Sequence, residues 1–310
     1  MTTEKKGQKK PRKTLKQRIP EILMALVFLI GLGIFLYPTI SDQWNRYRQS
    51  LLISSYSNTV SNMSQNQYDA EWERAQEYNS TITSNAFIGD VFDSEQVGEE
   101  DAAYWAALNV NGDGIMGYVS IPKINQEIPI YHGTSDKVLQ KGAGHLDGTK
   151  LPIGGIGCHS VLSAHRGLPS AKLFTDIDKL TTGDKFYLHI LDKTLAYEVD
   201  QILPMVDRND LDTLQQAMEN VEGQDYVTLL TCTPYGVNSH RLLVRGHRVE
   251  YLGEDENTDT AAESMLKAVQ NYYMLYIILI IAVILLTVLV IRLLRRAGKR
   301  KSAKPKEEGK

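Results

Sequence analysis

Two long apolar runs lie near the two ends of the chain. Residues 21–40 carry no charge after Glu21, and residues 271–291 contain no charged residue. Each run is long enough to cross a hydrocarbon core of about 30 Å as a helix. A buried core helix rarely stays apolar on every face over that length, so the pattern predicts two transmembrane helices. A cleaved signal peptide is the alternative for the first run, but no small-residue cleavage site follows it.

The charges that flank the two runs predict the orientation of the chain. Residues 1–20 carry eight Lys and Arg against one Glu, and residues 292–310 carry nine against two Glu. Because positive flanks stay in the cytoplasm, we expect both basic tails inside the cell and the region between the runs outside. Residues 39–291 hold 17 basic and 33 acidic residues. This acidic exterior disfavours nucleic acid as a partner.

Short segments with a strand pattern begin at Ile115 and are separated by turn residues. Strands are predicted over residues 116–121, 127–131, 157–164, 185–190, 194–202, 226–231 and 241–247. Short helices are predicted over residues 136–141, 170–180 and 209–220. Many short strands with few helices indicate a mainly β domain, either a closed barrel or a sandwich, over residues 114–252.

The segments that flank this domain differ from it in composition. Residues 41–82 lack Pro and Gly and space their aromatic and apolar side chains as a helix or a helical pair does. Residues 83–113 are acidic and rich in turn residues, which is typical of a linker or of a loop that docks on a domain. Residues 253–270 form an acidic linker that leads to the second apolar run.

Asn109, Asn111 and Asp113, followed by Gly114, imitate the start of a calcium-binding loop. The twelfth position of that loop is Ser120 and not the Glu that would supply a bidentate carboxylate. We therefore predict a turn into the first strand. No cluster of histidine, cysteine and carboxylate residues has the spacing of metal ligands, so neither a metal nor a cofactor is predicted.

The chain has two cysteines, Cys158 and Cys232, too few for a domain stapled by disulfides. Cys232 follows a predicted strand and precedes a turn. A reactive thiolate needs a cation or base nearby. Arg241 begins the return strand, across the hairpin from Cys232, where its guanidinium is placed to hold a thiolate or an oxyanion. An inert buried cysteine and a solvated strand arginine are the alternatives.

His165 differs from the other histidines because it follows an apolar stretch and precedes a loop. Cys158 lies seven residues earlier on the same run, and an odd spacing on a regular strand puts two side chains on opposite faces. Cys158 is therefore predicted to be a core residue, and Cys232 to face His165. A bridge between the two cysteines is disfavoured for the same reason.

The run Thr228-Leu229-Leu230-Thr231-Cys232 resembles the TLxTC signature of the sortase family. Arg241 follows nine residues later, and His165 lies in Ser-Ala-His-Arg-Gly-Leu-Pro, which is similar to the family's histidine at a strand end. The resemblance covers about residues 83–252. It implies a sortase-type closed β-barrel of about eight strands and a cysteine transpeptidase. In that enzyme Cys232 is the nucleophile, His165 the general acid and base, and Arg241 the cation for the oxyanion and the substrate.

Three features resemble class C, the sortases that assemble pili. Residues 111–124 are similar to the start of the class C barrel, and the second apolar run is typical of that class. Class C enzymes also cover the active site with a lid loop that carries Asp-Pro-aromatic, and Asp90-Val91-Phe92 lies where that motif belongs. The resemblance implies that Asp90 pairs with Arg241 and that Phe92 lies over the thiol. Val91 lacks the fixed φ of proline, which leaves the loop less pre-set; an acidic linker is the alternative.

The resemblance also implies a substrate and a location. Pilins or other surface proteins would present an LPxTG-like sorting signal, cleaved between Thr and Gly through a thioester on Cys232, and a pilin Lys amine would accept the acyl group. The enzyme would lie in a Gram-positive cell membrane with its catalytic domain outside. The alternatives are a housekeeping-type sortase that anchors proteins to the cell wall, a membrane-tethered cysteine protease, and a non-enzymatic membrane scaffold.

Overall fold

The computed structural model describes residues 19–83, 92, 101–253, 277 and 279–283. Several sequence predictions lie outside these residues: the basic tails, Asp90, the acidic linker after Gly253 and most of the second apolar run. The chain divides into two compact units, Met1–Tyr37 with Lys267–Lys310, and Pro38–Leu266. The barrel and all contacts described below belong to the second unit.

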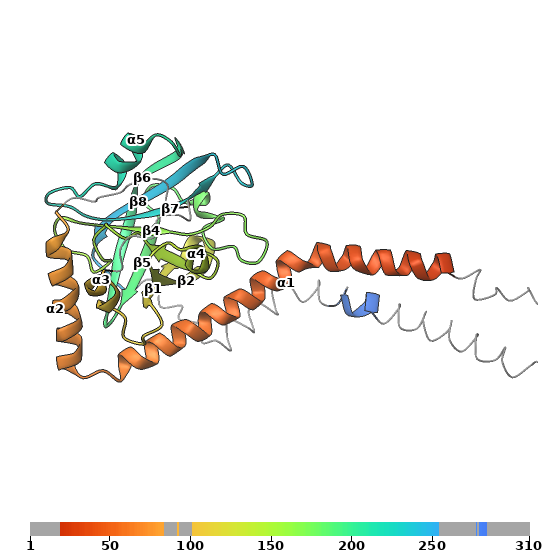
Figure 1. Ribbon diagram of the computed structural model, residues 1–310, viewed down its shortest axis with the longest axis horizontal. Coiled ribbons are helices and arrows are strands. Elements are labelled where there is room, and N and C mark those ends of the chain that lie inside the picture. The colour runs from red at the N-terminus through yellow and green to blue at the C-terminus, as the bar shows by residue number, and fades with distance from the viewer. Residues whose placement is uncertain (1–18, 84–91, 93–100, 254–276, 278, 284–310) are drawn as a thin grey trace, which may run out of the picture. The chain divides into compact units, whose positions relative to one another are not determined.

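Eight strands close into a single barrel in the order β1-β2-β3-β4-β7-β8-β6-β5 (Figure 1). Neighbouring strands are antiparallel except for two parallel pairs, β2 with β3 and β4 with β7. The strands are β1 Ile115–Ile121, β2 Gln126–His132, β3 Ala143–His145, β4 Cys158–Ser163, β5 Lys185–Ile190, β6 Lys193–Asp207, β7 Asp225–Thr233 and β8 His240–Val249. The mainly β fold and the closed barrel of about eight strands are thus confirmed.

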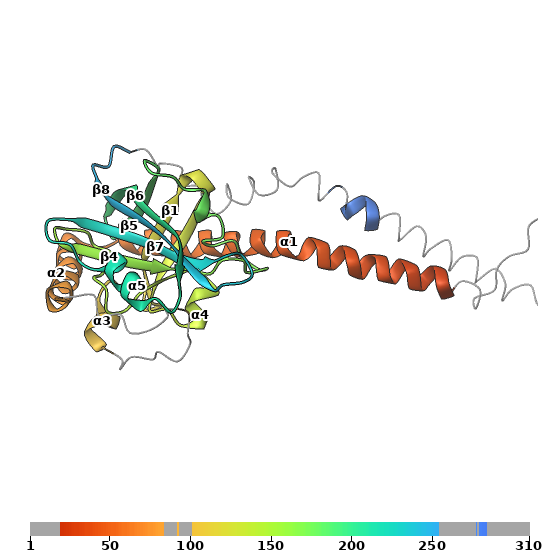
Figure 2. The same cartoon turned by 90° about the horizontal axis from the view of Figure 1, so that it is seen from above.

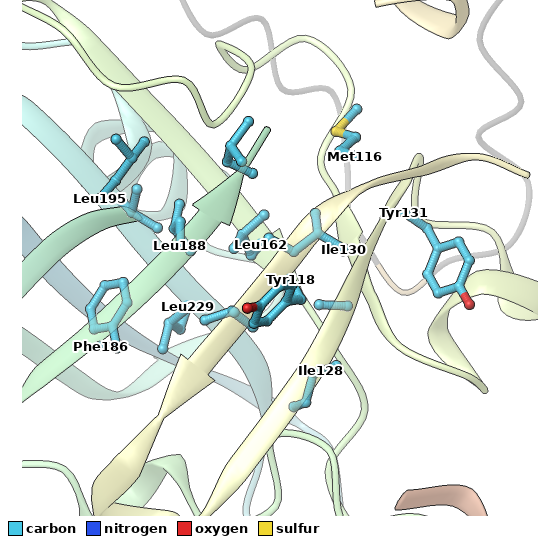
Figure 3. Close-up of a cluster of buried hydrophobic side chains, with 14 of the residues drawn as sticks. Met116, Tyr118, Ile128, Ile130, Tyr131, Leu162, Phe186, Leu188, Leu195 and Leu229 are labelled. Carbon is cyan, nitrogen blue, oxygen red and sulfur yellow. The ribbon is translucent and has the colours of Figure 1, made fainter. Parts of the chain in front are cut away.

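The barrel interior is filled by aliphatic and aromatic side chains from alternate strand positions, as the two-residue period of a strand requires. Ile130, Leu162, Leu188 and Leu229 come from β2, β4, β5 and β7 and converge on one another (Figure 3). All four are fully buried. Burying one such side chain contributes about 1.5–3 kcal/mol to the stability of the fold, so this layer of side chains stabilises the barrel strands.

The sequence prediction missed strand β3 because a glycine lies in it and glycine is uncommon in strands. Gly144 lies at its centre, and a Cβ there would come within 2.3 Å of the Gly133 carbonyl oxygen. The backbone at Gly144 therefore approaches that of Gly133 so closely that only glycine fits, although glycine in a sequence usually indicates a turn. Strand β6 also runs further than predicted, to Asp207. Pro204 suggests a strand end in the sequence, but it lies in an irregular stretch between Leu203 and Val206, where the pairing with β8 shifts and tolerates a proline.

The helix predicted over residues 170–180 is wrong. The only helical turn there is η3, Ile177–Lys179. The backbone N–H of Lys172 donates to a carboxylate oxygen of Asp42 at 2.8 Å, and Leu173 has a φ of +43°. A helix cannot pass through a left-handed leucine, so the segment instead forms a loop held by the N-terminal helix. The other two predicted helices are present as α4, Asp136–Leu139, and α5, Leu211–Met218.

Two helices precede the barrel, as predicted for residues 41–82, and a third short helix, α3 (Ala102–Ala106), follows them. Helix α1 runs from Ile19 to Ser61 without a break, so the boundary expected at residue 40 falls inside it. Helix α2, Gln65–Thr81, lies alongside the barrel (Figures 1 and 2). Tyr56 of α1 is buried, and its hydroxyl donates to the Met116 carbonyl at 2.9 Å.

Among the described residues, one helix is long and apolar enough to cross a membrane, over Leu26–Ser61. Several apolar side chains in its first part are exposed: Phe28, Ile34 and Phe35 are 61%, 71% and 74% exposed. The helix therefore agrees with the first predicted span. Of the second run only residues 277 and 279–283 are described, and they are helical.

Two buried histidines predict that the barrel loses stability in mild acid. Burial lowers the pKa of His145 to about 3 and that of His159 to about 4. Below pH 6.5 both imidazoles bind a proton in the unfolded chain but stay neutral in the folded protein. The free energy of unfolding therefore falls as the pH falls. From pH 7 to pH 5 we expect a loss of about 2 kcal/mol for each group, measured by urea unfolding followed by tryptophan fluorescence.

The matched variant for this prediction is His159→Gln. The imidazole of His159 donates through Nδ1 to the Glu219 carbonyl and accepts through Nε2 from the Thr228 hydroxyl, both at 2.8 Å. A glutamine amide offers the same pair of functions without titrating. The variant should lose less stability between pH 7 and pH 5 than the wild type; an equal loss in both proteins would contradict the prediction.

Candidate active site

Cys232 lies one residue before the end of β7 and is 5% exposed. In the antiparallel pairing of β7 with β8 its Cα partner is Arg241. The hairpin register therefore places a guanidinium beside the thiol, as the sequence spacing suggested. The ladder fixes the backbone beneath both side chains, which gives a nucleophile and a cation a constant mutual geometry.

Arg241 is 2% exposed, an unusual state for a charged side chain. Its Nη1 donates to the carbonyl oxygens of Asn238 at 2.9 Å and of His240 at 2.8 Å. Asn238 has a φ of +60°, a conformation that asparagine tolerates better than most residues. The loop between β7 and β8 thus turns two carbonyls toward one nitrogen of the guanidinium and fixes its position. A cation held in this way needs no reorganisation when negative charge develops next to it.

His165 follows β4, which runs parallel to β7 and pairs Ser163 with Leu230. The N–H of Ala164 still donates to the Leu230 carbonyl at 3.2 Å. Continuing the same register by two residues brings His165 level with Cys232. Burial lowers the pKa of His165, and the nearby carboxylate of Asp136 partly opposes this effect. The imidazole is therefore set toward its neutral form, from which it can accept a proton.

Phe92 is the one described residue between Thr83 and Asp101. Its ring centroid lies 5.0 Å from Cζ of Arg241 and 5.8 Å from the centroid of the His165 ring. It also packs against an apolar cluster of the barrel that includes Leu243. The aromatic side chain of the predicted lid is thus in contact with the two partners expected for the thiol. Its predicted companion Asp90 lies outside the described residues.

Cys158 occupies a different environment from Cys232. It lies in β4, its Sγ is 3.6 Å from the Leu151 carbonyl oxygen, and burial raises its pKa to about 12. Both cysteines are free thiols. Cys158 therefore stays protonated at neutral pH and serves as a small core residue, as predicted.

The other titratable side chains near these strands have structural partners. Arg245, on the same face of β8 as Arg241, forms a bidentate pair with Asp200 at 3.0 and 2.9 Å. His132 and His145 are buried, and the Tyr104 hydroxyl lies 3.0 Å from Nδ1 of His145. These contacts give Arg245, His132 and His145 structural roles, whereas the strand registers bring Cys232, Arg241 and His165 to one level of the barrel.

The turn predicted at the imitation calcium loop is confirmed. The Asn109 side chain accepts from the Gly114 N–H at 2.9 Å, and the Asp113 carboxylate accepts from the Ile115 N–H at 3.1 Å, where β1 begins. These side-chain oxygens cap a turn and serve the backbone. In the part of the chain that the structure describes, no group of three or more His, Cys, Asp or Glu side chains is placed to hold a metal.

Sequence reasoning did not single out Arg166, Thr231 or Thr233 as site residues. Arg166 directly follows His165, and the two threonines flank Cys232. The Thr231 hydroxyl donates to the Ala164 carbonyl at 2.7 Å, and Nη1 of Arg166 donates to the Thr233 hydroxyl at 3.0 Å. The only signal in the sequence was adjacency to the candidate residues, which says nothing about contact.

Comparison with known proteins relates this arrangement to one family. A sortase-domain model matches residues 119–249. Sortase C1 from Streptococcus agalactiae is 46% identical with a TM-score of 0.58, over 65% of this chain and 99% of that one. Streptococcus pneumoniae sortase C, whose substrates are pilins, is 46% identical with a TM-score of 0.55, over 64% and 97%. Sortase A of Bacillus anthracis is 25% identical over 236 residues, which cover 76% of this chain and 96% of that protein.

Proposed function

The chain belongs to the sortase family, in class C, and from that membership we propose that Cys232, His165 and Arg241 carry a cysteine transpeptidation that joins pilin subunits. The observation that carries the proposal is the pairing of Arg241 with Cys232 across the β7–β8 hairpin, at the level to which the β4–β7 register leads His165. Sortases are membrane-associated transpeptidases. The substrate, the acceptor and the individual roles are our proposal.

In the first half-reaction neutral His165 accepts the thiol proton of Cys232, and the resulting thiolate attacks the Thr carbonyl carbon of an LPxTG-like sorting signal. The carbonyl oxygen gains negative charge, and the fixed guanidinium of Arg241 stabilises that charge. The protonated imidazole of His165 then donates its proton to the Gly nitrogen as the C–N bond breaks. The products are a thioester on Cys232, a neutral His165 and a free Gly amine.

In the second half-reaction a Lys amine of another pilin attacks the thioester carbonyl. Neutral His165 removes the proton from the attacking nitrogen, and Cys232 leaves as a thiolate beside Arg241 and then takes that proton from His165. The lowered pKa of His165 supports this step, because an imidazole that is neutral near pH 7 can act as the base. The resulting isopeptide bond links two subunits.

We place the catalytic domain on the outer face of a Gram-positive cell membrane, with both basic tails in the cytoplasm. The charge flanks of the two apolar runs support this topology, and the exposed apolar side chains of the helix over Leu26–Ser61 support a membrane anchor at the first run. An outer location is also where pilins and other surface proteins carrying sorting signals meet the enzyme.

The test uses the full-length protein in detergent, a peptide with an LPxTG-like signal, and candidate pilins with or without an added amine. Mass spectrometry of the products should show the peptide, cut between Thr and Gly, joined to a pilin Lys. Cleavage with water as the only acceptor would indicate a protease. Transfer only to cell-wall amines would indicate a housekeeping-type sortase. No cleavage at all would indicate that the protein is a non-enzymatic membrane scaffold.

The contacts of Phe92 lead to a prediction about the lid. If Phe92 covers the site, changing Asp90 and Phe92 together to alanine should speed labelling of Cys232 by a thiol reagent about tenfold or more. Removing the ring uncovers the Arg241 guanidinium and one side of His165, both of which it contacts. The measurement is the labelling rate at neutral pH.

The matched control for the lid is Trp105→Ala, because Trp105 is another aromatic outside the barrel strands, stacked on His132 and not on a candidate site residue. It should leave the labelling rate of Cys232 within about twofold of wild type. Equal rates in the lid variant and in wild type would mean that residues 83–101 form a linker only.

A further inference from the structure

Two hydrogen bonds bracket the level at which His165 and Cys232 lie side by side. On one side the Thr231 hydroxyl donates to the Ala164 carbonyl at 2.7 Å. On the other side the Arg166 guanidinium donates to the Thr233 hydroxyl at 3.0 Å. Each bond joins a neighbour of His165 to the corresponding neighbour of Cys232. The 67-residue offset of the β4–β7 pairing is therefore kept by side chains past Ser163, the last residue of β4.

Beyond Ser163 the backbone ladder between β4 and β7 ends, and these two side-chain bonds continue its register. The last ladder bond runs from the Ala164 N–H to the Leu230 carbonyl. Gly167, two residues past His165, has a φ of +82° and turns the chain away into a loop. His165 therefore lies at the point where a strand becomes a loop, and a backbone at such a point frays easily.

Arg166 contacts two parts of the chain at once. While Nη1 binds Thr233, Nη2 donates to a carboxylate oxygen of Asp178 at 2.5 Å. The Arg166 side chain is 11% exposed and that of Asp178 is 43% exposed. An ion pair with one open partner adds little stability in water. The bond to Thr233 differs because it lies at the end of β7, one residue from the thiol.

The bond between Arg166 and Thr233 lies on the side of β7 opposite the Cys232 thiol, so it can fix the position of the backbone but cannot contact the reacting atoms. Successive side chains of a strand point to opposite faces, so Thr231 and Thr233 point away from the face that carries the Cys232 thiol. The guanidinium of Arg166 binds on that opposite face and holds the backbone from behind.

We propose that Arg166 is a positioning residue, which through Thr233 locks His165 level with Cys232. The inference rests on the proposed function, since it assumes that His165 and Cys232 exchange a proton during the reaction. A displacement of about 1 Å in such a pair can cost about a hundredfold in rate. The substrate does not need to touch Arg166 for this effect.

The test breaks the same bond from both ends in the full-length protein. Arg166→Met removes the donor, and Thr233→Val removes the acceptor with almost no change of shape. With a sorting-signal peptide and an amine acceptor, each variant should lose about 10- to 100-fold in kcat, with KM within about twofold of wild type. The double variant should be no slower than the slower single one, because both remove one interaction.

Two further variants separate positioning from plain stability. Thr233→Ser keeps the hydroxyl and should restore near wild-type kcat. Asp178→Asn weakens the ion pair but leaves the bond to Thr233, so its kcat should also stay close to wild type. The acid limb of the kcat/KM profile should move up toward pH 6.5 in Thr233→Val, because a loosened His165 is less buried and loses part of the lowering of its pKa. Thermal unfolding of each variant is measured alongside.

The proposal is overturned if Thr233→Val is folded and turns over at the wild-type rate with an unshifted pH profile. It is also overturned if Asp178→Asn loses as much rate as Arg166→Met, because the ion pair would then be the cause. If Arg166→Met does not fold, the comparison of Thr233→Val with Thr233→Ser tests the proposal by itself. Cys232→Ala is assayed in the same series. If that variant remains active, the proposed function fails, whereas an inactive Cys232→Ala beside a fully active Thr233→Val rejects only the role of Arg166.

Discussion

Replacing Cys232 with alanine should abolish cleavage of a sorting-signal peptide and transfer to an amine, by about a thousandfold or more. The expected loss is this large because the thiolate forms the covalent intermediate. The alanine fits the space of a side chain that is 5% exposed, so the fold should persist. Product formation is followed by mass spectrometry, with circular dichroism to verify the fold.

The second cysteine supplies a matched control. Cys158 is equally buried, but its thiol has a pKa raised to about 12 and faces the Leu151 carbonyl. Cys158→Ala should keep full activity and lose about 1–2 kcal/mol of stability at most. A Cys158→Ala enzyme that is folded but inactive, or a Cys232→Ala enzyme that still transfers acyl groups, would be incompatible with the assigned nucleophile.

Changing Arg241 to alanine should lower kcat by about a hundred- to a thousandfold, the usual cost of losing an oxyanion donor. Arg241→Lys should recover only part of this loss. Lysine keeps the charge but not the planar fork, of which one nitrogen is bound to the carbonyls of Asn238 and His240. Single-turnover kinetics with the peptide would separate the chemical step from substrate binding.

Arg245 is the control for Arg241 because it lies four residues along the same strand and on the same face. Its guanidinium pairs with Asp200 and lies over the Tyr226 ring, with Cζ 4.1 Å from the centroid. Arg245→Ala should therefore cost stability and leave kcat within about threefold of wild type. Equal losses of kcat at the two arginines would show that any cation on this face serves, against a specific role for Arg241.

The relation between Cys232 and Arg241 was predictable from sequence because a hairpin is local. Nine residues separate the two side chains, and an antiparallel return strand leaves few registers that bring an arginine opposite the cysteine. The relation to His165 is of another kind. It depends on the parallel pairing of β4 with β7 at an offset of 67 residues, and a single sequence carries no direct record of such a long-range register. There the family signature supplied what local pattern could not.

The features that sequence reasoning missed share a physical cause. Strand β3 is three residues long and needs glycine for a close backbone approach, so both its length and its composition read as a turn. The loop after His165 read as a helix because its residues have helical propensity. Its conformation is set instead by contacts with α1, including the bond from the Lys172 N–H to Asp42. Tertiary contacts override local preference in both places.

Intact-protein mass spectrometry of the full-length enzyme tests directly whether Cys232 is the nucleophile. The enzyme is mixed with excess LPxTG-like peptide, without an amine, and quenched in acid. We expect an adduct equal in mass to the peptide acyl group up to Thr, mapped by proteolysis to Cys232. Hydroxylamine should release it, and the Cys232→Ala variant should lack it. An adduct on Cys158 or on another residue, or turnover by Cys232→Ala, would contradict the account.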